Sequence, residues 1–141
     1  MKIPKWLFAL FLIIISFIGF LDATYITLKH YLGVPITCSI LNGCEKVTTS
    51  VYSTVFNIPV ALIGSVYYLI IFALIILYLD IKKETIFYTA SKITALGFIA
   101  SIWFTYLQIF VLKAFCFYCL VSSGTSTILF ILGIIALKLK K

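Results

Sequence analysis

Charged side chains are scarce in this sequence. Of its 141 residues, 11 are basic and 4 are acidic, and every basic residue is a lysine because arginine is absent. Soluble domains have about 25% charged and about 45–50% apolar residues, whereas this chain has 11% charged and 64% apolar residues. A soluble globular protein is therefore excluded. The lysines flank apolar runs, so we expect no nucleic-acid partner.

Four long apolar runs make up most of the chain. A helix needs about 20 residues to cross a bilayer, and we expect such spans at residues 6–26, 58–79, 93–112 and 115–137. They leave no room for a second folded domain. The prediction is an all-α membrane protein, a four-helix bundle that forms one domain over residues 1–141. The end of the first run lacks the small-x-small pattern of a cleavage site, so we expect an uncleaved anchor.

Lysine positions predict the orientation of the bundle. Eight lysines lie beside the termini or between the second and third spans, and three lie in the other two connections. Because lysine-rich segments stay in the cytoplasm, we expect cytoplasmic termini and an outward-facing loop at residues 27–57. Hydrophobic residues at helical spacing over residues 47–56 predict a short amphipathic helix that covers the mouth of the bundle.

All four cysteines fall on the predicted outer face. Cys38 and Cys44 lie in the outer loop, and Cys116 and Cys119 open the fourth span as a CxxC motif. Close pairs on an oxidising face are typical of redox-active pairs, and a helix N-terminus favours a thiolate. Cys119 lies nearly one turn deeper than Cys116, about 4–5 Å along the helix. This arrangement suits electron transfer between a surface thiol and an oxidant dissolved in the lipid.

Other uses of these cysteines lead to different protein classes. A four-cysteine zinc site would need all four thiolates in one closed tetrahedron. A small four-helix transporter or soft-metal-handling protein would use the cysteines as metal ligands. A transporter also needs polar residues along its spans, and the second and third spans have few. We therefore expect two redox pairs and no metal.

Two polar features inside the spans have more than one interpretation. Small residues such as those at 122–127 mark close helix packing in most membrane helices, although Ser122 and Ser123 remain candidates for lining a cavity. Asp22 lies near the outer end of the first span. An ionisable residue in a membrane raises the hypothesis of a proton relay, but its position near the interface favours solvation.

The motifs together resemble one family. The C-x5-C pair is followed by Ser50 and by the run Pro-Val-Ala-Leu-Ile-Gly at residues 59–64, and the CxxC motif comes last in the chain. This combination is similar to the vitamin K epoxide reductase (VKOR) family and closest to its prokaryotic branch. DsbB oxidases share the chemistry and the number of helices, but their CxxC motif lies in the first outer loop.

The resemblance implies a membrane oxidoreductase that supports disulfide-bond formation outside the cytoplasm. It assigns the mixed disulfide with a thioredoxin-like, DsbA-like partner to Cys38. Cys44 would then attack Cys116, and Cys119 would reduce a membrane quinone such as menaquinone or ubiquinone. No thioredoxin-like domain follows the fourth span, so we expect the partner to be a separate protein.

The resemblance also implies a quinone site. Ser50 corresponds to the family's loop serine near the quinone. Val60 and Ser123 stand where the animal enzymes hold the quinone carbonyls with Asn and Tyr. These differences argue against vitamin K epoxide as the substrate, and they make Ser50, Val60 and Ser123 the predicted quinone-binding or supporting residues.

The predicted orientation can be tested by labelling. After reduction in intact cells, Cys38 and Cys44 should react with a membrane-impermeant maleimide, because the lysine asymmetry puts the loop outside. Labelling would be followed as a mass shift on gels, with lysed cells as the reference for full reaction. Labelling that occurs only after lysis would reverse the topology.

Overall fold

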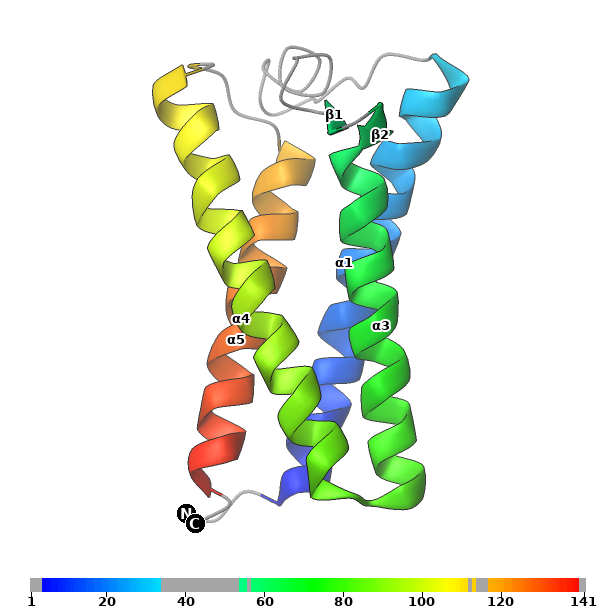
Figure 1. Ribbon diagram of the computed structural model, residues 1–141, viewed down its shortest axis with the longest axis vertical. Helices are drawn as coiled ribbons and strands as arrows, with labels where there is room; N and C mark the ends of the chain where they lie inside the picture. Colours follow the sequence, from blue (N-terminus) through cyan, green and yellow to red (C-terminus); the bar gives the residue numbers. More distant parts are fainter. Residues whose placement is uncertain (1–3, 34–53, 56, 112, 114–116, 140–141) are drawn as a thin grey trace.

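A computed structural model describes residues 4–33, 54–55, 57–111, 113 and 117–139. Its main elements are four long helices (Figure 1). They are α1 (Lys5–Leu32), α3 (Val60–Ile81), α4 (Glu84–Tyr106), which continues as the π-helical segment η2 (Leu107–Val111), and α5 (Phe117–Leu139). All four are long and apolar enough to cross a membrane. The prediction of an all-α bundle with four spans is confirmed.

The helices form a ring in which neighbours run in opposite directions. Helix α1 packs against α3 and α5, and α4 packs against the same two helices. Both chain termini lie at one end of the bundle, here called the terminal end (Figure 1). The opposite end carries two short strands and is called the hairpin end. The first residues of α3 and α5 lie at this end, so Cys119 does as well.

The hairpin joins the long connection to α3. Strand β1 (Thr54–Val55) pairs antiparallel with β2 (Ile58–Pro59), with Thr54 opposite Pro59 and Val55 opposite Ile58. Asn57 reverses the chain with a φ of 65°, a conformation that asparagine tolerates better than most residues. Thr54 and Val55 are therefore strand residues, although the predicted amphipathic helix included them. The rest of that prediction lies outside the described residues.

Two helices extend beyond the predicted spans. Helix α1 ends at Leu32 rather than near residue 26, because Thr27 is buried and its hydroxyl donates to the Ala23 carbonyl 2.8 Å away. Gly33, with a φ of 70°, then ends the helix. Helix α4 begins at Glu84 rather than near residue 93. The first turns of α4 bury Phe87 on one side. The polar residues of this segment therefore form the exposed face of a helix and not a loop.

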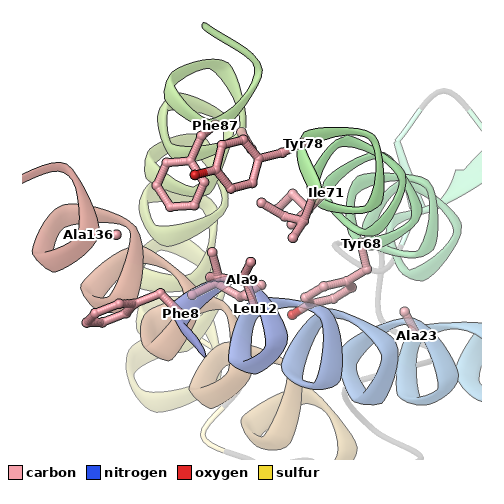
Figure 2. Packing of buried hydrophobic residues seen from close by; sticks show 12 residues of the cluster. Phe8, Ala9, Leu12, Ala23, Tyr68, Ile71, Tyr78, Phe87 and Ala136 are labelled. Atoms are coloured by element: carbon pink, nitrogen blue, oxygen red, sulfur yellow. The ribbon is translucent and has the colours of Figure 1, made fainter. Parts of the chain in front are cut away.

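The interior changes in character along the bundle. Near the terminal end the core is mainly apolar and includes Leu12, Ile71, Tyr78, Phe87 and Ala136 (Figure 2), and the buried hydroxyl of Thr94 there bonds to the Ser91 carbonyl of its own helix. Toward the hairpin end the buried polar residues include Thr27, Ser65, Gln108 and Ser126, and the Ser65 hydroxyl bonds to Thr24 of a neighbouring helix. Polar groups inside a membrane protein serve as interhelical contacts or as functional groups. The hairpin end also holds Cys119, so a thiol and an interhelical hydroxyl contact lie in the same half of the bundle.

Two glycines allow the tyrosines of α3 to enter this interior. A methyl group at Gly19 of α1 would lie 2.5 Å from Cε1 of Tyr68, and one at Gly97 of α4 would collide with the Tyr67 hydroxyl. Figure 2 shows the Tyr68 ring lying across α1, close to Ala23. Small residues at such crossings let membrane helices approach closely. The close approach gives each ring a path between two helices.

Replacing Gly19 with alanine should weaken the bundle. The added methyl group displaces the Tyr68 ring, and overpacking of this kind costs about 1–3 kcal/mol of unfolding free energy. The measurement is denaturation of the purified protein in detergent. Gly124→Ala is the matched control, because nothing lies within 4 Å of that position. Equal stability of the two variants would contradict the proposed role of the glycine.

Candidate functional site

Two adjacent tyrosines connect α3 to α5 across the bundle. The Tyr68 hydroxyl donates to the Ser122 carbonyl at 2.7 Å, and it also lies 2.8 Å from Thr125 Oγ1 and 3.1 Å from Ser122 Oγ. The Tyr67 hydroxyl lies 3.5 Å from Ser126 Oγ. We call these five residues the tyrosine layer. It separates the apolar core from the hairpin end.

The other face of α5 borders a pocket against α4. Ser123 Oγ lies 3.3 Å from Thr105 Oγ1. These two residues line a pocket of about 200 Å³ together with Ser101, Ile102 and Thr127. We call it the α4–α5 pocket. Sites for drug-sized ligands occupy about 300–1,000 Å³, so this pocket is large enough for one ring system but not for a long tail.

The polar run at residues 122–127 therefore serves two purposes. Ser122, Thr125 and Ser126 belong to the tyrosine layer, as expected for close packing. Ser123 and Thr127 are four residues apart and share the face that lines the pocket. Of the two predicted cavity residues, Ser123 lines the pocket, whereas Ser122 bonds to Tyr68.

Cys119 lies one helical turn nearer the hairpin end than both of these groups. It is half-buried, and residues 122 and 123 are its neighbours at the i+3 and i+4 positions of the same helix. The start of α5 is held against α1 by Tyr118, whose ring centroid lies 5.0 Å from that of Tyr25. Cys119 thus lies one helical turn above the boundary between the tyrosine layer and the α4–α5 pocket.

The remaining predicted site residues are distributed differently. Val60 is half-buried as the first residue of α3 and does not line the α4–α5 pocket. Cys38, Cys44, Ser50 and Cys116 lie outside the described residues. Their predicted roles stay predictions. Among the described residues no group of three potential metal ligands occurs.

Several site residues were missed by sequence reasoning. Ser101 and Thr105 line the pocket and are four residues apart on α4, and the buried Gln108 follows them in η2. A polar stripe of this kind within an apolar span indicates a polar contact or a binding site between helices. Tyr68 carried no such signal, because tyrosines are common at membrane interfaces, and its depth depends on Gly19.

Asp22 differs from its predicted surroundings. Solvation was the favoured interpretation, but Oδ2 of Asp22 is buried and has no hydrogen-bond partner. It is the one such side-chain atom in the described part of the chain. The reason is the packing of α5 and of the Tyr68 ring against this part of α1, which keeps water from one side of the carboxyl group.

The fold and the site together define a class of protein. Four helices long and apolar enough to span a membrane form the bundle, and a half-buried thiol lies near the start of α5, with hydroxyl groups on both sides of the next turn of that helix. This is a multi-pass membrane protein with a thiol site. The sequence model of the Vitamin K epoxide reductase family matches residues 10–134, and the chain belongs to that family. A search of curated proteins finds no match. As a family member, the chain is a membrane thiol–disulfide oxidoreductase.

The tyrosine layer predicts a measurable contribution to stability. Tyr68→Phe removes the hydroxyl that bonds to Ser122 and Thr125, and a net hydrogen bond of this kind is worth about 0.5–1.5 kcal/mol. Tyr88→Phe is the control, because Tyr88 is exposed on α4 beneath the ammonium group of Lys92. Denaturation in detergent measures both variants. If the two lose the same stability, the layer does not hold α5.

Proposed function

We propose that this protein passes electrons from a separate thioredoxin-like protein to a membrane quinone. The partner's dithiol is oxidised by a Cys38–Cys44 disulfide, through a mixed disulfide at Cys38. The loop dithiol then reduces a Cys116–Cys119 disulfide by thiol–disulfide exchange, with Cys44 attacking Cys116. Each exchange forms one disulfide and breaks another. Two electrons and two protons therefore pass at each stage from the partner to the loop pair and then to the CxxC pair.

The last step transfers these electrons to the quinone. The Cys116–Cys119 dithiol becomes a disulfide, and its two electrons and two protons convert the quinone to a quinol. Cys119 is the better donor of the pair because it lies deeper along α5. The observation that carries the proposal is its position, one turn from the hydroxyl groups of Ser123 and Thr105.

The α4–α5 pocket is our candidate site for the quinone ring. Its hydroxyl groups can donate hydrogen bonds to the two carbonyl oxygens, and Ile102 offers an apolar contact to the ring. The volume of about 200 Å³ accommodates the ring, while a lipid tail would extend along the outside of the helices. Ser123 and Thr105 are proposed to bind the quinone carbonyl oxygens. Ser50 and Val60 are proposed as supporting residues of the quinone site.

The orientation proposed for this chemistry follows from the lysines. Their excess at the terminal end favours cytoplasmic termini. The hairpin end with Cys119 would then face the compartment in which protein disulfides form. A family member placed in this way would regenerate the oxidised partner that introduces disulfides into other proteins.

Replacing Cys119 tests the order of electron flow. In Cys119→Ser, exchange between a Cys38–Cys44 disulfide and a reduced thioredoxin-like protein at Cys38 should persist. The Cys116 thiolate can attack Cys44 of that disulfide and release the Cys38 thiol, so a Cys44–Cys116 disulfide should accumulate because no Cys119 thiol remains to open it. Reduction of a short-chain quinone should stop. Absorbance of the quinone and mass spectrometry of the disulfides give the two measurements.

The controls separate binding from electron transfer. Ser123→Ala and Thr105→Val should raise the KM for the quinone without blocking internal exchange, whereas Thr89→Val, on the exposed face of the same helix α4, should change neither. Wild-type quinone reduction by Cys119→Ser, together with an inactive Cys116→Ser, would show that Cys116 faces the quinone. Wild-type protein that oxidises a partner dithiol but reduces no quinone would contradict the proposed acceptor.

A further inference from the structure

The buried carboxyl group of Asp22 has no role in the electron path described so far. Its Oδ2 atom is buried without a hydrogen-bond partner, an arrangement that is rare in native proteins and calls for an explanation. Lys29, on the same helix, lies with its ammonium group 5.6 Å from the ring centroid of Tyr25. This lysine is therefore directed to a tyrosine ring rather than to the carboxyl group.

The contacts of its neighbours locate Asp22 relative to the thiol. One turn toward the terminal end, Gly19 meets the Tyr68 ring, and the hydroxyl of that ring reaches Ser122. One turn toward the hairpin end, Tyr25 lies against Tyr118 of α5. Asp22 is bracketed by these two contacts, and so it lies level with the turn of α5 that runs from Cys119 to Ser122.

The titratable groups near the level of Asp22 lie on two neighbouring helices and on α1 itself. From α3 these are Tyr67, whose hydroxyl lies beside Ser126, and Tyr68, which lies within electrostatic range of the carboxyl group. From α5 they are Tyr118 and Cys119. On α1 itself they are Tyr25 and Lys29. Among these groups, the thiol is the one that must lose a proton during the proposed reaction.

We propose that Asp22 is the proton acceptor for the Cys119 thiol, an inference that rests on the proposed function. When the Cys116–Cys119 dithiol is oxidised, the S–H bond of Cys119 breaks and the Asp22 carboxylate takes the proton. The two sulfurs form a disulfide, and their two electrons pass to the quinone. The proton on Asp22 and the proton from Cys116 then complete the quinol, so Asp22 returns to its starting form.

Burial explains why a carboxyl group suits this task. A lone carboxylate in a low-dielectric interior is costly, and so is a lone thiolate at the same depth. A proton that moves between the two sites keeps a single negative charge in the interior throughout. Without Asp22, the thiol proton would have to reach water before the thiolate could form.

Single-turnover oxidation tests this transfer. Pre-reduced full-length protein is mixed with a short-chain quinone, and quinol formation is followed in H2O and in D2O. Asp22→Asn should slow the step by about 100-fold, the size typical of a lost general base, and raise its solvent isotope effect. Asp22→Glu should restore most of the rate. Asp80→Asn, which alters an exposed carboxyl group at the terminal end of α3, should behave as wild type.

A second measurement does not depend on quinone. In a full-length chain whose other three cysteines are serine, the rate of Cys119 alkylation by a small neutral reagent is measured against pH. Two coupled groups titrate in two steps, so the profile should have two steps when Asp22 is present and one step in Asp22→Asn. Identical profiles, or an unchanged single-turnover rate and isotope effect in Asp22→Asn, would overturn the proposal. If the wild type reduces no quinone but the two alkylation profiles still differ, only the quinone is overturned as the electron acceptor.

Discussion

The arrangement of the hairpin end depends on how two neighbouring tyrosines cross the bundle. Lipid is as apolar as a leucine side chain, so membrane helices are held by close packing and by hydrogen bonds rather than by hydrophobic burial. Helices α3 and α5 are not neighbours in the ring, yet Tyr68 and Tyr67 tie them together through hydroxyl contacts. Gly19 and Gly97 make this possible, because any side chain there would collide with a tyrosine.

The rotation of α5 follows from this bridge. With Ser122, Thr125 and Ser126 turned toward the tyrosines, Ser123 and Thr127 must face α4, because successive helical residues are about 100° apart. The same rotation places Cys119 one turn above the boundary between the two faces. The tyrosine layer and the α4–α5 pocket thus use neighbouring residues of α5. A change that disturbs the tyrosine layer should therefore also move the residues that line the pocket.

The two halves of the bundle suit different tasks. The half near the termini is mainly apolar, with Leu12, Ile71, Phe87 and Leu129 in its core, and the buried hydroxyl of Thr94 is satisfied within its own helix by the Ser91 carbonyl. The hairpin half holds hydroxyls, an amide and one buried oxygen of the Asp22 carboxyl group. Where a polar atom is buried, bulk water is a poor proton acceptor and a nearby side chain can take that role. A redox reaction that moves two protons with two electrons benefits from this arrangement.

The sequence by itself determined the class of protein, the four spans, their approximate limits and the family, because hydropathy and cysteine spacing are local properties that need no knowledge of packing. It also predicted Ser123 as a cavity residue, and Ser123 lines the α4–α5 pocket. Only the tertiary structure decided that Ser122 and Ser123 have separate partners, that Ser101 and Thr105 join the pocket, and that Asp22 is shielded from water. The first two depend on the rotation of α5 relative to its neighbours. The last depends on a tyrosine and a glycine that are 49 positions apart in the chain, and no pattern within one helix records that contact.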